Sequence, residues 1–266
     1  MSATARLLQL ILLGLSALLS ATAHSIEKPL ILTLVADPYC PYNCAYGATQ
    51  QGYVIDLARM IFEPEGYQVQ YQILPWSRAV NEVREGNFTA AIGVSGQNGR
   101  GLILPKQPIG IVNDIFMVHR SSHWKYQGVH SLKQIHLGSV ANYDYGDELN
   151  RYLKDPANQH RVQSLVGDQA VERNLRMLGR KRIDAYIEDA NVGFYMAATM
   201  GLSGQFKSAG SKGKSMPIYL GFSPKLSLSP KLAQLFDHRL QQLREEGKLK
   251  LLLRRYHLDD WLELDD

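Results

Sequence analysis

The sequence predicts an α/β protein, because strand-like apolar runs alternate with amphipathic helical segments along most of its 266 residues. Leu30 to Val35 is a short apolar run that ends at Asp37-Pro38, as a buried strand does. Helical spacing follows in Val54, Leu57, Ala58 and Ile61, and residues 68–73 then alternate like a half-buried strand. This strand–helix–strand order is typical of a parallel sheet covered by helices.

The rest of the chain continues the alternation. We expect further strands at residues 90–94, 111–118, 135–140, 183–187 and 217–222. We expect further helices that begin near Trp76, Leu149, Gly167, Ala190, Ser229 and Lys248. The helix from Ser229 has the best end signals, with Ser229 as N-cap, Pro230 at its first position and Gly247 past its end. Residues 202–215, rich in glycine, serine and lysine, are expected to form a loop.

Composition and motifs argue against several functions. The net charge of +4 comes from interspersed charges, with no basic stripe and interleaved aromatic residues, so nucleic-acid binding is not expected. The 8 histidines are scattered without metal-ligand spacing, so no metal site is expected. Neither a nucleophile elbow nor a dinucleotide-binding glycine motif is present, so we expect no cofactor and no enzyme of those classes.

Residues 1–23 have the order of a secretory signal peptide. Arg6 precedes the apolar run Leu7 to Leu19, and an Ala-x-Ala site precedes His24. The run is too short for a comfortable membrane span, although an uncleaved N-terminal anchor is the alternative. We therefore expect an exported, periplasmic protein that begins at His24.

The chain has 2 cysteines, Cys40 and Cys44, in the segment DPYCPYNC. An even number of closely spaced cysteines in an oxidising compartment favours a disulfide. Such a bridge closes a very small loop, so its main expected effect is to stiffen that loop. A metal site is the alternative, and it lacks a second pair of ligands.

Two loops at the carboxyl ends of expected strands are candidates for a binding site. One follows the first strand and carries Tyr39. The other, Ser95 to Arg100, offers small polar residues, backbone N–H groups and an arginine, which suit a carboxylate. The alternative for Arg100 is a solvated surface arginine after an ordinary turn. Trp76 is a further candidate, although an aromatic residue at a helix start more often packs into the core.

A set of motifs resembles the bacterial periplasmic solute-binding proteins of the polar amino acid class, family 3. The matching segments are Gly52-Tyr53-Val-Ile-Asp56-Leu57, Pro75-Trp76-Ser-Arg78, the loop arginine, Arg182-Ile-Asp184-Ala-Tyr-Ile-Glu-Asp189, and the run from Leu235 through Gly247-Lys248 to Tyr256. The resemblance covers residues from about 30 to 257. It implies a two-lobed type II periplasmic binding fold with the ligand between the lobes. Lobe one would comprise residues 24–117 and 216–266, and lobe two residues 118–215.

The resemblance also implies roles for individual residues. Arg100 would hold the ligand carboxylate and Asp189 the ligand ammonium. Tyr39 and Tyr53 would cover the ligand from lobe one. Lobe two would contribute Tyr143, Asp144 and Tyr145. The family usually has a threonine three residues before the arginine, and this chain has Gln97 there.

These observations predict a monomeric periplasmic receptor for a small polar ligand, an amino acid or a relative. The number of tyrosines suggests a flat or cationic ligand held by ring faces. The receptor would deliver its ligand to the membrane permease of an ABC transporter. Two alternatives remain open: a sensory binding protein that reports to a membrane receptor, and a dehydratase-type enzyme that uses Asp144 with Asp189 or Glu188.

Overall fold

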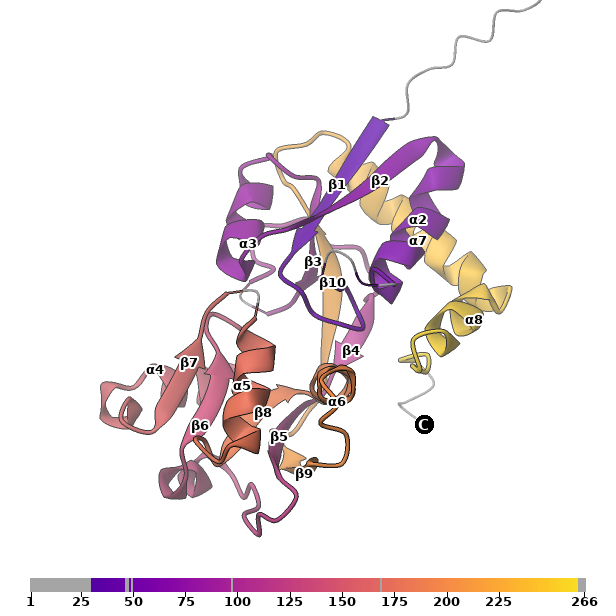
Figure 1. Ribbon diagram of the computed structural model, residues 1–266. Helices are drawn as coiled ribbons and strands as arrows, with labels where there is room; N and C mark the ends of the chain where they lie inside the picture. Colours follow the sequence, from indigo (N-terminus) through magenta and orange to yellow (C-terminus); the bar gives the residue numbers. More distant parts are fainter. Residues whose placement is uncertain (1–29, 46–47, 49, 97, 168, 263–266) are drawn as a thin grey trace, which may run out of the picture.

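Two five-stranded sheets form the centres of two lobes. The computed structural model describes residues 30–45, 48, 50–96, 98–167 and 169–262. The strand order is β2-β1-β3-β10-β4 in one sheet and β7-β6-β8-β5-β9 in the other. Figure 1 shows the two lobes one above the other, with strands leading from one to the other. The predicted α/β class is confirmed.

Lobe one holds both ends of the described chain. Its strands are β1 (Leu30–Ala36), β2 (Tyr67–Ile73), β3 (Ala90–Val94), β4 (Gly110–Val112) and β10 (Met216–Phe222). Its helices are α2 (Tyr53–Phe62), η1 (Glu63–Glu65), α3 (Trp76–Arg84), α7 (Ser229–Glu245) and α8 (Lys248–Arg254). β1 runs parallel to β2 and β3, so the carboxyl ends of β1 and β3 meet at one edge. β10 runs antiparallel to β3 and β4.

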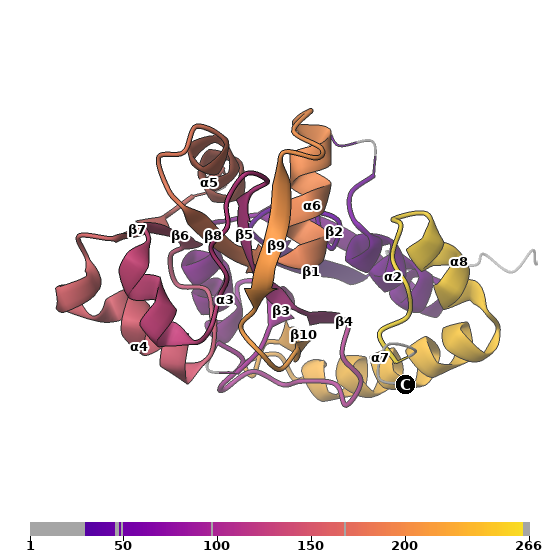
Figure 2. The same cartoon turned by 90° about the horizontal axis from the view of Figure 1, so that it is seen from below.

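Lobe two is one continuous stretch of chain. Its strands are β5 (Asp114–His119), β6 (Leu137–Val140), β7 (Val162–Leu165), β8 (Ala185–Asp189) and β9 (Phe206–Ser211). Its helices are η2 (Val129–Gln134), α4 (Asp147–Lys154), η3 (Pro156–Asn158), α5 (Ala170–Gly179) and α6 (Ala190–Thr199). In Figures 1 and 2, α4 and β7 lie at the opposite side of the molecule from α7 and α8.

The chain passes between the lobes twice. The first crossing is Asn113, between β4 and β5, and the second is residues 212–215, between β9 and β10. The single strand expected over residues 111–118 is therefore two strands that belong to different sheets. The run is interrupted only by Asn113 and Asp114, and this polar pair marks the position where the chain changes sheet. We place the first lobe boundary at Asn113 rather than between residues 117 and 118.

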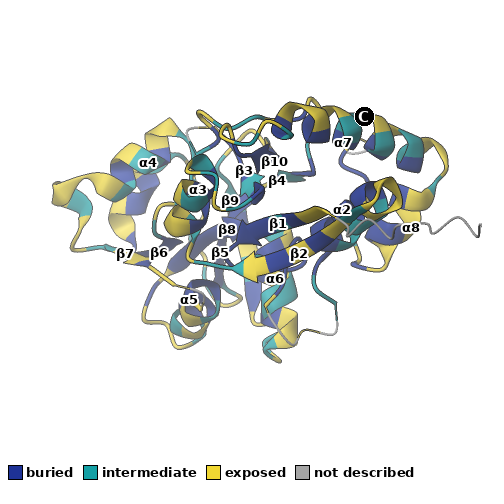
Figure 3. Cartoon of the chain, turned by 90° about the horizontal axis from the view of Figure 1, so that it is seen from above, coloured by how far each residue is buried: buried dark blue, intermediate teal, exposed yellow. Residues whose placement is uncertain are grey.

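The helices pack by the faces that their sequences indicate. In α2, Val54, Leu57, Ala58 and Ile61 are fully buried. Figure 3 shows the pattern throughout, with buried strands inside and the exposed faces of helices outside. Gly52, at the start of α2, has φ 109°, and a Cβ there would collide with the backbone of Tyr42 and Asn43. This contact holds the tyrosine-rich loop close to the first helix.

Two local predictions were wrong. The expected loop of residues 202–215 contains β9, an edge strand whose glycine and serine residues obscure its pattern. Ser229 is the first residue of α7 rather than its N-cap, which is Leu228. The Ser229 hydroxyl is buried without a hydrogen-bond partner, so it caps nothing.

Residues 1–23, the expected signal peptide, lie outside the described part of the chain. Within the described part, every helix is too short or too polar to cross a membrane.

Candidate ligand-binding site

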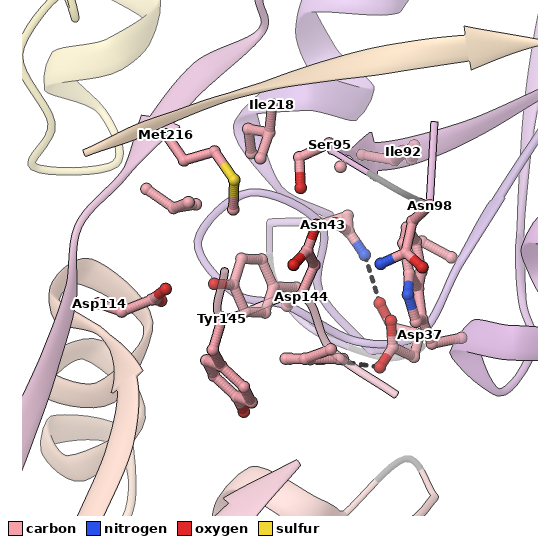
Figure 4. Close-up of a pocket in the computed structure, with 16 residues that line it drawn as sticks. Asp37, Asn43, Ile92, Ser95, Asn98, Asp114, Asp144, Tyr145, Met216 and Ile218 are labelled. Carbon is pink, nitrogen blue, oxygen red and sulfur yellow. Dashed lines mark hydrogen bonds between the residues drawn. The ribbon is translucent and has the colours of Figure 1, made fainter. Parts of the chain in front are cut away.

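A small cavity of about 60 Å³ lies between the lobes. Both lobes contribute to its wall, and Figure 4 shows the residues as sticks. The polar and aromatic lining comprises Asp37, Tyr39, Asn43, Trp76, Ser95, Asn98, Asp114, Tyr143, Asp144 and Tyr145. Apolar lining comes mainly from Ile92, Val112, Met216 and Ile218. The cavity is therefore acidic and aromatic on its polar sides.

Lobe one supplies the cavity from the loops that follow β1 and β3. Asp37 comes directly after β1, and its backbone oxygen accepts a hydrogen bond from Asn43 Nδ2 at 2.6 Å. The same amide donates to the Tyr71 hydroxyl at 3.0 Å, which ties the loop to β2. Ser95 comes directly after β3 and is buried. Both loops lie where the parallel strands end, as expected for a ligand site in such a sheet.

Lobe two supplies the cavity from the loop after β6. Tyr143, Asp144 and Tyr145 follow one another there, and the Tyr145 hydroxyl accepts a hydrogen bond from Val140 N at 2.9 Å. Asp144 Oδ1 accepts hydrogen bonds from Gly146 N at 3.1 Å and from Asn150 Nδ2 at 2.8 Å. These bonds fix the turn that carries the three side chains.

Asp114 brings a buried carboxylate to the cavity at the start of β5. Its Oδ2 lies 2.6 Å from Nζ of Lys212, and both side chains are largely buried. Burial raises the pKa of Asp114, and Lys212 opposes this shift without cancelling it. The charge of nearby Asp144 raises this pKa further. In the view of Figure 4, Asp144 lies between Asp114 and Asp37.

The tyrosines of the cavity remain neutral hydroxyl groups at neutral pH. Burial raises the pKa of Tyr39 well above its usual value, and the carboxylate of Glu188 adds to the effect. Burial likewise raises the pKa of Tyr143, with a further contribution from Asp37. The rings of these two tyrosines meet edge to face at 5.9 Å between centroids. They offer ring faces to a ligand.

Direct contacts across the cleft hold the lobes together. The Tyr143 hydroxyl donates to Asp37 Oδ2 at 2.7 Å. Gly96, in the loop after β3, lies so close to Asp144 that a Cβ would collide with Asp144 Oδ2. The described conformation is therefore a closed one, in which the cavity is small because the lobes touch.

Six of the nine predicted site residues line this cavity: Tyr39, Trp76, Ser95, Tyr143, Asp144 and Tyr145. They come from four separate segments of the chain, and the structure brings them together. Trp76 stands at the start of α3 and its ring meets that of Tyr143 at 6.4 Å between centroids. These residues remain candidate ligand contacts.

The structure does not place Arg100 in the cavity. Arg100 is exposed, and it is absent from the residues that line the space. Its distance from the strand suggested that Arg100 would enter the cleft. Because the loop turns after Ser95, Arg100 lies outside the cleft instead. The preceding Gln97, at the family's threonine position, lies outside the described residues.

A different arginine, Arg84, makes hydrogen bonds to the backbone of this loop. Arg84, in the last turn of α3, donates from Nη2 to the backbone oxygen of Asn98 at 2.9 Å and to that of Arg100 at 3.3 Å. Its Nη1 donates to Asn81 Oδ1 at 3.3 Å. Arg84 therefore holds the shape of the loop that carries Ser95 and Asn98.

Asp189 also lies away from the cavity, at the first crossing between the lobes. Its Oδ2 accepts a hydrogen bond from Asn113 N at 2.8 Å, and its Oδ1 accepts from Val192 N at 3.2 Å as the N-cap of α6. The Tyr42 hydroxyl of lobe one donates to the same Oδ1 at 3.3 Å. Asp189, which the family resemblance assigned to the ammonium group of the ligand, instead anchors the hinge. The pairing of Asp144 with Asp189 considered for an enzyme is therefore not present on the cavity wall.

Glu188 and Asp189 are fully buried neighbours with unusual titration. Burial raises the pKa of Glu188 to about 8, against hydrogen bonds from Tyr186 and Asp189 N. Burial raises the pKa of Asp189 to about 7, because the loss of hydration of the charged carboxylate outweighs the hydrogen bonds that stabilise it. Neither carboxylate lines the cavity.

Tyr53 is part of the core of lobe one rather than of the cavity. Its ring packs against those of Tyr42 and Trp261, and its hydroxyl donates to the backbone oxygen of Ile109 at 2.7 Å. Only 1% of its surface is exposed, so a ligand in the cavity does not reach it. Tyr53 therefore does not cover a ligand in this cavity, as the family resemblance implied that it would.

Four polar lining residues were not predicted: Asp37, Asn43, Asn98 and Asp114. The sequence does offer a sign that Asp37 belongs to a site, because Asp37 directly follows the first strand and precedes a proline. It offers one for Asp114 too, which is a single charged residue inside the apolar run of residues 111–118. Asn43 and Asn98 are ordinary loop residues whose sequence context resembles that of any turn.

The predicted disulfide between Cys40 and Cys44 is confirmed. It closes residues 40–44, which include Asn43 on the cavity and Tyr42 at the hinge, and Tyr39 of the cavity wall directly precedes the bridge. Within the described residues, no three histidine, cysteine, aspartate or glutamate side chains come together as a metal site would require.

The fold and its cavity define a two-lobed binding protein of the type II periplasmic class. Residues 31–259 match the family of bacterial extracellular solute-binding proteins, family 3, and the chain belongs to this family. No curated protein matches the sequence.

Solved structures share the fold. A histidine kinase sensor domain similar to periplasmic binding proteins has a TM-score of 0.71 at 17% identity, covering 85% of this chain and 95% of its own. A mutant of the arginine-binding protein ArgBP from T. maritima has a TM-score of 0.70 at 14% identity, with the same coverages of 85% and 95%. The arginine-, lysine- and histidine-binding protein ArtJ from Geobacillus stearothermophilus has a TM-score of 0.68 at 15% identity, covering 86% and 95%. The predicted two-lobed fold is confirmed.

Proposed function

We propose that this protein is a periplasmic receptor that captures a small polar ligand, an amino acid or a relative, between its lobes. The closed form with its ligand then delivers that ligand to the permease of an ABC transporter. Membership of a solute-binding family and the amino acid ligands named for ArtJ support this function.

The observation that carries the proposal is the cavity wall built from both lobes. Asp37, Tyr39 and Ser95 come from lobe one, whereas Asp114, Tyr143 and Asp144 come from lobe two. A ligand that contacts both walls binds the closed state more tightly than the open one. It therefore shifts the population toward closure by this difference in affinity.

A thermal-shift screen tests capture. The protein is expressed with its own leader, purified from the periplasm and screened against amino acids, polyamines and small organic acids. A ligand that binds only the folded state adds about 2.7 kcal/mol of stability at a hundredfold excess over Kd. A rise in Tm, with a smaller radius of gyration in X-ray scattering, supports the proposal. A flat response across all three classes contradicts it. Intact mass shows whether the chain begins at His24.

A sensory role is the second candidate, and the likeness to a histidine kinase sensor domain favours it. Uptake distinguishes the two. Deletion of the gene abolishes import of the labelled ligand if the protein serves a transporter. If the protein is a sensor, import continues and only the transcriptional response to the ligand is lost.

A further inference from the structure

A second, larger cavity of about 250 Å³ adjoins the cavity between the lobes. Four residues line both spaces: Trp76, Asn98, Tyr143 and Asp144. The larger space, the outer cavity, also has walls from α3 of lobe one and α4 of lobe two, which Figures 1 and 2 show on the same side of the molecule. A ligand that is longer than the first, inner cavity therefore extends between these two helices.

The two cavities differ in the charges of their walls. The described lining of the inner cavity includes no arginine, lysine or histidine. That of the outer cavity includes two cations, Arg84 of α3 and Lys154 of α4, with one carboxylate, Asp144. Four side-chain amides complete its polar wall: Asn81, Asn98, Asn142 and Asn150. Cations and amide N–H groups are the partners that a carboxylate requires, so the outer cavity suits an anion better than the inner one.

Arg84 is already fixed in position by hydrogen bonds. It donates to three uncharged oxygens, those of the Asn81 side chain and of the Asn98 and Arg100 backbone. These bonds use three of the five N–H groups of an arginine. Within the described part of the chain, neither Arg84 nor Lys154 forms an ion pair with a carboxylate. A guanidinium that is held in this way loses little conformational freedom when it binds an anion.

The other cations near the cleft do not serve a ligand. Arg100, which the family resemblance assigned to the ligand carboxylate, is exposed and lines neither cavity. Lys212 forms its ion pair with Asp114 at 2.6 Å. Arg84 and Lys154 are therefore the cations that a carboxylate meets in the described lining of this cleft. Because they belong to different lobes, a carboxylate that contacts both also favours the closed state.

We propose that the ligand carries a carboxylate and that the outer cavity binds this group between Arg84 of lobe one and Lys154 of lobe two. The remainder of the ligand lies in the inner cavity, among apolar and aromatic side chains. This proposal rests on the proposed function, because it assigns a subsite within the same cleft. Its distinguishing claim is that Lys154, and not Arg100, recognises the negative charge of the ligand.

Titration calorimetry at neutral pH, with pairs of a carboxylate and its primary amide, tests this subsite. The pairs are lysine and lysinamide, glutamine and glutaminamide, leucine and leucinamide, and δ-aminovalerate and its amide. Any other carboxylate that raises Tm in the thermal-shift screen is added with its own amide. In at least one pair we expect the carboxylate to bind about tenfold or more tightly than the amide, because the amide lacks the charge and keeps the shape.

Lys154→Gln isolates the charge that α4 supplies. It should weaken binding of the carboxylate about three- to fivefold, near the upper end of what an exposed ion pair contributes. It should leave the Kd of the amide unchanged, because the amide forms no ion pair. Lys154→Arg should restore the affinity for the carboxylate. Lys231→Gln, at an exposed position of α7 on the opposite side of the molecule, removes the same charge and should change neither Kd.

The results that overturn the proposal differ from those that overturn the receptor function. If the amides bind as tightly as the carboxylates, or if Lys154→Gln has the same effect on both, the receptor function stands and the subsite assignment fails. The assignment also fails if polyamines raise Tm and no carboxylate does. If neither the pairs nor the wider thermal-shift screen shows binding, the receptor function fails as well.

Discussion

Tyr143 of lobe two donates a hydrogen bond to Oδ2 of Asp37 in lobe one, with 2.7 Å between the two oxygen atoms. The bond joins two residues of the cavity wall across the cleft. It therefore contributes to closure as well as to the shape of the site.

Tyr143→Phe removes this bond and leaves the ring. A hydrogen bond to a charged group contributes about 1.5–3 kcal/mol, so we expect weaker ligand binding and a smaller decrease in the radius of gyration when ligand is added. Tyr152→Phe is the matched control, because the Tyr152 hydroxyl is buried in lobe two without a hydrogen-bond partner. A decrease in the radius of gyration on ligand addition equal to that of the wild type would show that other contacts suffice for closure.

Gly96→Ala should prevent full closure. Gly96 has φ 43°, and its Cβ would collide with Asp144 Oδ2 across the cleft. Gly101→Ala carries the same kind of backbone cost, at φ 79°, with nothing within 4 Å. We expect similar Tm values for the two variants and at least about tenfold weaker ligand binding for Gly96→Ala alone. Equal affinities in the two variants would mean that the lobes bind ligand without this close approach.

Arg100→Ala and Arg84→Ala distinguish the contributions of these two arginines to ligand binding. Arg100 is exposed outside the cavity, so its removal should change Kd by less than about twofold, below 0.5 kcal/mol. Arg84 holds the loop through the backbone oxygens of Asn98 and Arg100, so its removal should weaken binding and lower Tm. Calorimetry on both variants checks this order. A large loss for Arg100→Ala would restore the carboxylate clamp expected from the sequence.

Stability should fall as pH rises through neutrality. The pKa of Glu188 is about 8 when folded, against an ordinary value of 4.5, so between these values the folded state keeps a proton that the unfolded chain has released. This stabilisation is complete below the lower value and is lost as pH rises through the upper one. The charges of Asp114 and Asp189 add to the shift.

Glu188→Gln should flatten this dependence, by at most about 1.4 kcal/mol per pH unit. Urea unfolding at several values from pH 5 to about pH 8 measures the slope. Glu148→Gln, at an exposed position of α4, is the control and should keep the wild-type slope. If Glu188→Gln keeps the wild-type slope of unfolding free energy against pH, a residue other than Glu188 carries the proton that the folded state retains.

The Cys40–Cys44 disulfide should affect binding as well as stability. Replacing both cysteines by serine removes a very short loop closure, which the chain-entropy relation values at about 2 kcal/mol. We also expect weaker ligand binding, because the loop carries Tyr39 and Asn43 of the cavity wall. Urea unfolding and calorimetry measure the two effects. Wild-type affinity in the double variant would show that the loop keeps its shape without the bridge.

The sequence predicted the fold better than the site because periodicity reports burial, whereas a site depends on how loops turn. The helix from Tyr53 and the strand before Ser95 followed directly from their patterns. Arg100 illustrates the limit, because its spacing from the strand is that of a ligand-binding arginine. The turn after Ser95 sends it outward.

Asp189 and Asp114 illustrate a second limit. Both are acids at strand ends, and the sequence offers no means of telling which one the hinge uses. Three donors, from Asn113, Val192 and Tyr42, make that choice in favour of Asp189. Such distant hydrogen bonds have no local signature.

The position of β10 between β3 and β4 sets an order on biosynthesis. Residues 114–211 contain every strand of the second sheet, so lobe two has all its strands when the ribosome has passed β9. Lobe one at that moment still lacks an interior strand, and its sheet is complete only after residues 216–222 emerge. The later-starting lobe is therefore the first able to fold, although domains usually fold from the N-terminus onward.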